Sequence, residues 1–140
     1  MLGTLVEIRV PDGTDPRGVS DAFAAVERVH RLMRAQETTS DVSRINRARP
    51  GADVPVDEWT QCVLRRALEI SSATGGVFDC CVGTGSQVDL ELMPGFAVRK
   101  RRPLRITLDG IAKGFAVDQA VATLCDAGVE TGAVNAGGDL

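Results

Sequence analysis

An α+β fold is predicted by two hydrophobic patterns that follow one another along the 140 residues. Residues 4–10 alternate between apolar and polar side chains, which is typical of a strand with one solvated face. Residues 19–35 instead carry apolar side chains at helical spacing. The sequence has no internal repeat and no long linker, so we expect a single domain over residues 1–140. With 44% hydrophobic residues, such a chain can bury a core of its own.

The charge and hydropathy of the sequence exclude two classes of protein. Its 16 basic and 19 acidic residues give a net charge of −3, which excludes a protein that binds mainly the phosphate backbone of nucleic acid. No apolar run approaches the roughly 18–20 residues needed to span a bilayer. The first ten residues contain Glu7 and Arg9 and lack the basic-then-apolar build of a signal peptide. As written, the sequence predicts a cytoplasmic protein with no nucleic-acid partner.

The first half of the chain predicts a strand, two helices and a loop. The turn-like residues 11–16 end the strand, and the helix over 19–35 follows. Residues 36–55 are polar and predict a loop, in which Val42 and Ile45 pack one short turn onto the core. A second helix begins near its N-cap Asp57 and ends at residues 74–76, where two glycines follow a threonine. The apolar positions of the first helix are Val19, Phe23, Val26, His30 and Met33.

The second half predicts two more strands and one more helix. Residues 104–108 alternate between apolar and polar side chains, which predicts a strand. A helix over residues 112–127 follows and stops at Gly128. Ala133 begins a last strand, which breaks at Gly137 and Gly138.

The cysteines and the single histidine do not form a recognisable metal or catalytic motif. The four cysteines lie at positions 62, 80, 81 and 125 with no CxxC pair, and His30 is distant in sequence, which disfavours a zinc site. His30 is predicted to be a packed helix residue. Cys80 and Cys81 point to opposite faces if their segment is extended. We expect free thiols there, with a vicinal disulfide as the alternative.

Residues 108–118 form the segment with the strongest chemical signal, LDGIAKGFAVD, where a strand meets a helix. Small residues at 110, 112 and 114 let backbone amides approach a ligand, and a helix N-terminus favours anions. Lys113 adds a positive charge, so a phosphate site and a tight turn with a solvated lysine remain equal alternatives. We expect larger residues at Gly110 and Gly114 to be poorly tolerated, either because φ is positive or because a ligand comes close.

Three further segments carry weaker chemical signals. Residues 74–79 (TGGVFD) either form a shelf for a flat ring or end a helix and bury Phe78. Residues 40–46 (SDVSRIN) indicate only a capped loop. Residues 135–140 (NAGGDL) indicate a close backbone approach or a bulge. The basic run at 99–102 could suggest nucleic acid or acidic lipid, but a solvated loop or hairpin face is favoured.

Five segments in order, LGT, SDVSRIN, TGGVFD, LDGIAKGFAVD and VNAGGDL, resemble the ApbE family of FAD:protein FMN transferases. The resemblance implies a T-fold-like mixed sheet with packed helices. It also implies FAD as substrate and Mg²⁺ as cofactor. Members transfer FMN to a Thr or Ser hydroxyl of an acceptor protein and release AMP. The resemblance runs from Leu2 to Leu140 and covers the first part of the family's domain, so we expect its C-terminal part to be missing.

The resemblance also implies site residues. Leu2 takes a place usually held by Met beside the flavin, and Gln36 falls where an aromatic residue often stacks on the cofactor. Gly110 lies where the family places a metal-contacting residue, and Thr107 stands where many relatives carry Asp. The implied cofactor-binding residues are Leu2, Gln36, Val77, Phe78, Asp79, Thr107 and Lys113.

The part of the family pattern that follows Leu140 carries later Asp and Thr metal ligands. We therefore expect the 140-residue chain alone to transfer no FMN. A non-catalytic flavin-binding or interaction remnant of the same fold is the alternative function. A second copy in a homodimer is a further possible source of the missing ligands. Relatives are often periplasmic lipoproteins, in contrast to the location expected from this sequence as written.

Overall fold

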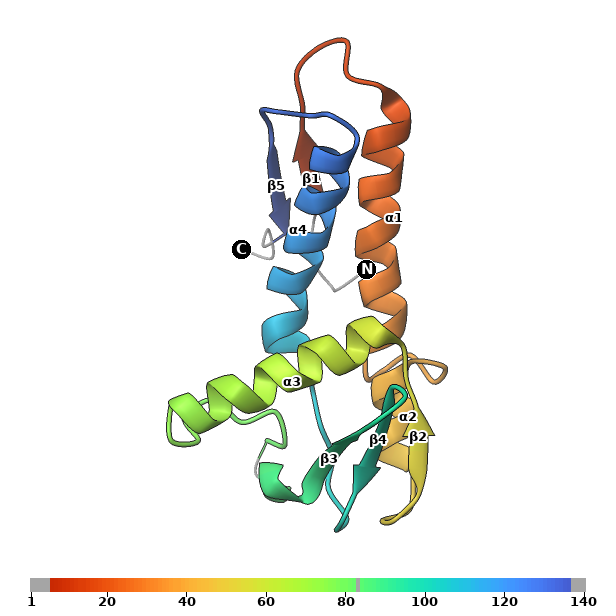
Figure 1. The fold of residues 1–140 in the computed structure, drawn as a ribbon, viewed down its shortest axis with the longest axis vertical. Helices are drawn as coiled ribbons and strands as arrows, with labels where there is room; N and C mark the ends of the chain where they lie inside the picture. The colour runs from red at the N-terminus through yellow and green to blue at the C-terminus, as the bar shows by residue number, and fades with distance from the viewer. Residues whose placement is uncertain (1–5, 83, 137–140) are drawn as a thin grey trace. The chain divides into compact units, whose positions relative to one another are not determined.

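Four α-helices and two antiparallel sheets make up the described part of the chain, residues 6–82 and 84–136, in a computed structural model (Figure 1). This content confirms the predicted α+β class. The chain divides into two compact units, residues 1–30 with 112–140 and residues 31–111, which are described separately below. No helix in the described ranges is both long and apolar enough to cross a membrane.

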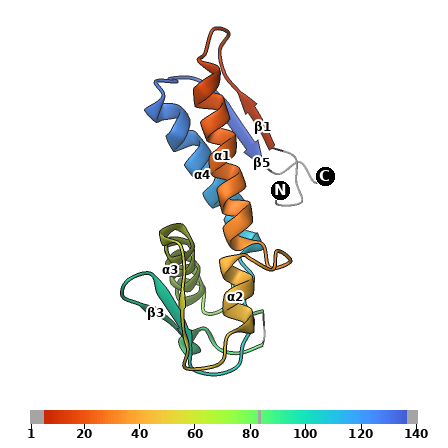
Figure 2. The same ribbon diagram turned by 90° about the vertical axis from the view of Figure 1, so that its right-hand side faces the viewer.

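The first unit contains a two-stranded sheet and most of two long helices. Strand β1 (Val6–Arg9) pairs antiparallel with β5 (Ala133–Ala136), and Val6 lies opposite Ala136. Helices α1 (Pro16–Met33) and α4 (Asp109–Asp126) run beside this sheet (Figure 2). A Cβ atom at Gly18 would lie only 2.9 Å from that of Ala127, so the two helices are closely packed at this end.

The sequence predictions for this unit are confirmed within the described residues. The first and last strands and both helices are present, although α1 and α4 each begin three residues before the predicted start. Gly128 follows α4 with φ +87, as expected for a glycine that ends a helix. His30 is buried, as expected for a packed helix residue. Residues 137 and 138, the predicted break of the last strand, lie outside the described residues.

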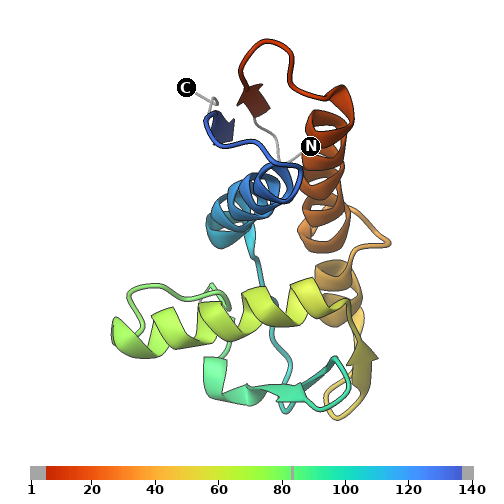
Figure 3. The same cartoon turned by 45° about the horizontal axis from the view of Figure 1, so that its top comes forward.

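The second unit places helix α3 (Glu58–Ala73) alongside a three-stranded sheet (Figure 3). The strand order is β2 (Asp53–Pro55), β4 (Ala97–Lys100) and β3 (Leu90–Met93), all antiparallel. The buried Gln61 of α3 donates from Nε2 to the carbonyls of Met93 and Ala97 at 2.9 and 3.2 Å. Its amide therefore ties the helix to the two strand ends that face the β3–β4 turn.

Helix α3 confirms the predicted start and stop signals. Asp57 is the N-cap, and its carboxylate accepts a hydrogen bond from the Trp59 amide at 2.8 Å. Thr74 is the C-cap, and Gly75 and Gly76 follow with φ values of +64 and +89. Only glycine adopts such angles readily, so the two glycines turn the chain away from the helix axis.

The predicted loop over residues 36–55 is wrong in two places, because it contains helix α2 (Asp41–Arg47) and strand β2. The Ser40 hydroxyl accepts a hydrogen bond from the Ser43 amide at 3.0 Å and caps α2. Val42 and Ile45, predicted to pack one turn onto the core, are completely buried. Beyond the loop or hairpin face expected for the basic run at 99–102, the strands β3 and β4 and the short 3₁₀ helix η1 (Gln87–Asp89) before them were not predicted.

Asp41 joins the beginnings of α2 and α3. One oxygen of the Asp41 carboxylate accepts a hydrogen bond from the Arg44 guanidinium at 2.5 Å. The other oxygen accepts from the Asp57 amide at 2.8 Å and from the Thr60 hydroxyl at 2.7 Å. Asp41 and Thr60 are both buried. Arg44 also donates to the Pro55 carbonyl at 2.7 Å. The carboxylate thus satisfies buried donors from two helices at once.

The basic run at residues 99–102 lies largely on a hairpin face and pairs with acidic side chains, as the structural interpretation predicted. Arg99 meets Asp53 at 2.6 Å and holds the pKa of that carboxyl below its usual range. Arg101 pairs with Glu91. Lys100 is the exception, because it is buried and donates to the carbonyls of Asn46 and Leu104, both at 3.2 Å. Burial lowers the pKa of Lys100.

Candidate functional site

Two of the segments selected from the sequence lie against one another in the second unit. The first is the Gly-Gly loop, residues 74–82, and the second is the beginning of α4 with the residues before it. The Thr107 amide donates to the Cys80 carbonyl at 2.9 Å. A Cβ atom at Gly110 would lie 3.7 Å from Cε2 of Phe78, so the ring rests beside the glycine. Phe78 and Gly110, which are 32 positions apart in the chain, therefore meet in space.

The Gly-Gly loop is shaped by the end of α3. The Thr74 hydroxyl donates to the Ile70 carbonyl at 2.8 Å and accepts from the Phe78 amide at 3.2 Å. Val77, the residue between the glycines and Phe78, is 89% exposed, while Phe78 is half-buried. Such a large exposed aliphatic side chain beside a phenyl ring gives the loop an apolar surface that faces solvent.

Residues 104–108, called the clamped segment below because two side chains hold its backbone, bury alternate side chains as predicted for a strand. They do not form a strand. Leu104, Ile106 and Leu108 are buried, yet no neighbouring strand pairs with them within the described residues. Hydrogen bonds from side chains replace the backbone hydrogen bonds that a neighbouring strand would make. Asn46 accepts from the Ile106 amide at 2.8 Å and donates to the Ile106 carbonyl at 3.1 Å.

Thr84 holds the same segment one residue earlier. Its hydroxyl accepts from the Arg105 amide at 2.9 Å and donates to the Arg105 carbonyl at 3.0 Å. These contacts satisfy backbone groups that a strand would satisfy by pairing. Sequence reasoning missed Asn46 and Thr84 as positioning residues. The only available signal was that Asn46 ends the SDVSRIN segment.

The clamped segment leads directly into the first turn of α4. The Thr107 hydroxyl accepts from the Asp109 amide at 3.4 Å, just before the helix begins. Asp109 and Gly110 are exposed in this first turn. A helix N-terminus attracts negative charge, and the anionic Asp109 complements it. Lys113 follows within α4 and belongs to the first unit of the chain.

The donor set of the described residues does not fit a magnesium site built by protein groups alone. No group of three or more His, Cys, Asp or Glu side chains gathers in the described ranges. Asp79, one of the implied site residues, accepts a hydrogen bond from the Cys81 amide at 2.9 Å. Since Mg²⁺ requires a near-octahedral set of oxygens, the side chains of this part of the chain would hold the ion only weakly by themselves.

Two further implied site residues belong to neither of these segments. Leu2 is outside the described residues. Gln36 is exposed in the turns that connect α1 to α2. Phe78, Thr107 and Gly110 lie in the two segments that contact one another. The roles of all the implied site residues remain predictions.

The conformational expectation for the two glycines of α4 is wrong. Neither Gly110 nor Gly114 has a positive φ, because both lie in regular helix. A Cβ atom at Gly114 would meet no described atom within 4 Å, and at Gly110 it would make only ordinary contact with Phe78. Without a ligand, neither position is crowded.

We expect Gly114→Ala to raise the free energy of unfolding by about 0.5–1 kcal/mol, because alanine replaces glycine inside a helix. Urea unfolding followed by circular dichroism measures the change. Gly128→Ala is the matched control and should lower stability, since φ there is +87. A loss of stability in Gly114→Ala would contradict the inference that a Cβ atom fits at this position without steric conflict.

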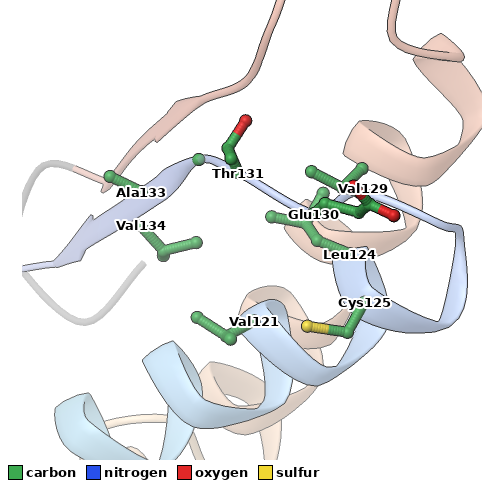
Figure 4. Close-up of a pocket in the computed structure, with 9 residues that line it drawn as sticks. Val121, Leu124, Cys125, Val129, Glu130, Thr131, Ala133 and Val134 are labelled. Carbon is green, nitrogen blue, oxygen red and sulfur yellow. The ribbon is translucent and has the colours of Figure 1, made fainter.

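A small pocket in the first unit is separate from these residues. It lies between the end of α4 and β5 and is lined largely by aliphatic side chains, including Val121, Leu124 and Val134 (Figure 4). Its volume of about 110 Å³ is well below the roughly 300–1,000 Å³ of cofactor sites. This pocket is therefore not the flavin site implied by the sequence.

The model of the ApbE family matches residues 2–90 and 84–140, which together span almost the whole sequence. The chain belongs to the ApbE family. No curated protein matches it.

Solved ApbE structures share this fold. A mutant of the flavin transferase ApbE from Vibrio cholerae matches with a TM-score of 0.90 at 23% identity, over 99% of this chain and 58% of its own. The ApbE protein from Thermotoga maritima matches with a TM-score of 0.85 at 24% identity, over 98% and 54%. The apo flavinyl transferase ApbE from Pseudomonas stutzeri gives 0.82 at 19%, over 95% and 54%. The chain thus has the ApbE fold and spans somewhat more than half the length of these relatives.

Proposed function

We propose that this chain forms the flavin-binding part of an FAD:protein FMN transferase. The proposed reaction breaks the pyrophosphate of FAD, joins FMN to a Thr or Ser hydroxyl of an acceptor protein, and releases AMP. Membership of the ApbE family supports the reaction class. The observation that carries the proposal is the contact of Phe78 with Gly110, which joins the two segments that the family resemblance assigns to the cofactor.

The residues of this chain are proposed to bind and orient FAD. Val77 and Phe78 offer an apolar surface to the flat flavin ring. Backbone amides in the first turn of α4 favour the charged pyrophosphate, and Lys113 adds a positive charge in the same helix. When bound, FAD itself supplies the phosphoryl group and the AMP leaving group. Binding these parts in a fixed orientation is the contribution expected from this half of the fold.

Truncation of the Phe78 ring is expected to weaken FAD binding. We expect Phe78→Ala to raise the Kd for FAD about tenfold, which corresponds to the loss of roughly one aromatic ring contact. Flavin fluorescence during a titration of the 140-residue chain measures the Kd. Phe96→Ala is the matched control, because Phe96 lies at the tip of the β3–β4 hairpin and is 48% exposed. Equal affinities for the two variants would remove Phe78 from the site.

Loss of the Lys113 charge is expected to weaken FAD binding in a salt-dependent way. Lys113→Ala should lower affinity more at low than at high ionic strength, because salt screens a lysine–phosphate attraction. The same titration, repeated at two salt concentrations, measures the effect. Arg65→Ala removes one exposed charge from α3 and should leave the affinity unchanged. An unchanged Kd for Lys113→Ala at both salt concentrations would exclude the lysine from the pyrophosphate site.

The alternative is a non-catalytic flavin-binding or interaction protein of the same fold. Covalent flavin on a threonine-containing acceptor peptide distinguishes the two functions, because it remains fluorescent in a denaturing gel. A band that needs both FAD and added Mg²⁺ supports the transferase. FAD binding without any such band is the result expected from the 140-residue chain alone, and the absence of FAD binding would contradict the proposed flavin-binding role.

A further inference from the structure

Cys80 and Cys81 form a pair of adjacent thiols that the proposed flavin site does not use. Both are free, with 2% and 0% of their surfaces exposed. The expectation that they point to opposite faces holds only for an extended segment, and residues 80–82 instead form a turn. As a result both side chains are buried within one turn. The turn therefore holds the two sulfur atoms within reach of one another.

The backbone of this pair carries the contacts that hold the Gly-Gly loop to its surroundings. The Cys80 carbonyl accepts from the Thr107 amide at 2.9 Å. The Cys81 carbonyl accepts from the Thr84 amide at 3.0 Å, and it shares the single hydrogen of the Thr84 hydroxyl, at 2.7 Å, with the Arg105 carbonyl. The Cys81 amide donates to Asp79 at 2.9 Å. Any change in the peptide unit between the cysteines therefore acts on the clamped segment.

We propose that Cys80 and Cys81 are a redox modification site, at which a hydroperoxide closes a vicinal disulfide and thereby releases the Thr107 amide from the Cys80 carbonyl. One thiolate first attacks hydrogen peroxide, so that the O–O bond breaks and a sulfenic acid and hydroxide form. The neighbouring thiol then displaces the sulfenic oxygen. An S–S bond results, both thiol hydrogens leave in two molecules of water, and peroxide takes up the two electrons.

Ring closure must move the backbone at this pair. Consecutive Cα atoms lie about 3.8 Å apart across a trans peptide. Cysteines joined by an ordinary disulfide have Cα atoms roughly 4.4–6.8 Å apart. The bridge is therefore strained, and the carbonyl that receives Thr107 lies inside the strained ring. Strained disulfides have more oxidising potentials and are readily reduced, which makes the modification reversible.

Oxidant can reach the pair through local opening of the loop. Residues that flank the pair in the loop are exposed, with Val77 at 89% and Val82 at 56%. Val82 also has φ +45, an angle that is unfavourable for a β-branched residue and lowers the cost of leaving this conformation. The Cys81 thiol lowers the pKa of Cys80, while Cys80 and burial raise the pKa of Cys81, so Cys80 is the thiol of the pair that ionises first.

The test uses the 140-residue chain carrying Cys62→Ser and Cys125→Ser, which removes the two exposed thiols. The protein is treated with hydrogen peroxide, its remaining thiols are alkylated under denaturing conditions, and the peptide containing residues 80 and 81 is analysed by mass spectrometry. We expect this peptide to lose two hydrogens and both alkylation sites, and to recover them after dithiothreitol. The same background with Cys81→Ser is the control and cannot close the ring.

Amide hydrogen exchange tests the second part of the proposal without using flavin. Oxidation should accelerate exchange of the Thr107 amide about tenfold, the effect of losing one backbone hydrogen bond. The Ile106 amide, which donates to Asn46 instead, should change little. Single sulfinic or sulfonic adducts, or two thiols that remain alkylatable, would overturn the site. A disulfide that leaves Thr107 exchange unchanged would overturn the coupling to the clamped segment.

Discussion

Asp41→Ala is expected to lower the free energy of unfolding by about 3–5 kcal/mol, because it leaves two donors without their buried acceptor and removes the carboxylate that pairs with the partly exposed Arg44. Those donors are the Asp57 amide and the Thr60 hydroxyl at the beginning of α3. Urea unfolding followed by circular dichroism and by Trp59 fluorescence measures the loss. Both signals should move together if the second unit unfolds in one step.

Asp53→Ala is the matched control for this substitution. Asp53 also pairs with an arginine, Arg99, at 2.6 Å, but the pair lies at the surface of the hairpin and is screened by solvent. Asp53→Ala should lower the free energy of unfolding much less than Asp41→Ala does. The decrease should become smaller still with added salt. Comparable losses for the two variants would show that the helix junction does not depend on Asp41.

Asn46→Ala is expected to lower the free energy of unfolding by about 2–3 kcal/mol, since the amide and carbonyl of the buried Ile106 both lose their partner. The same substitution should accelerate hydrogen exchange at the Ile106 amide. Unfolding in urea and exchange monitored by mass spectrometry give the two measurements.

Asn46→Asp separates the two hydrogen bonds of this side chain. Aspartate keeps an oxygen that accepts from the Ile106 amide but loses the donor to the Ile106 carbonyl. It should therefore protect the amide from exchange better than alanine does. If alanine and aspartate gave equal exchange at Ile106, the side-chain clamp would not be what holds this segment in place.

The helices that were predicted correctly are those whose caps and periodicity are local in sequence. Asp57 caps the first turn of α3, and Gly75 follows its last turn with a positive φ. Both signals lie next to the helix end that they determine, so they can be recognised in the sequence. The strand predicted at residues 104–108 failed for the opposite reason. Alternation reports which side chains are buried, whereas a strand also needs a partner, and here the partners are side chains of Asn46 and Thr84.

The candidate site shows the same division. The order of the five segments predicted the family. In the structure, Phe78 and Gly110, which belong to two of these segments, lie beside one another. The turn at Cys80 and Cys81 was not foreseen, because two adjacent cysteines carry no signal for a turn. The hairpin had a visible signal in Pro94 and Gly95, and Gly95 has φ +76.

The pairing of β1 with β5 has a consequence for the order of folding. Val6 and Ala136 lie opposite one another although nearly the whole described chain separates them, so this sheet has very high contact order. The unit of residues 31–111 is continuous, and all of it is synthesised before β5. Loop closure over such a length is entropically costly and is favoured once the intervening chain is already folded. We expect the β1–β5 ladder to be the last described element to form during synthesis, with β1 waiting unpaired until translation reaches residues 133–136.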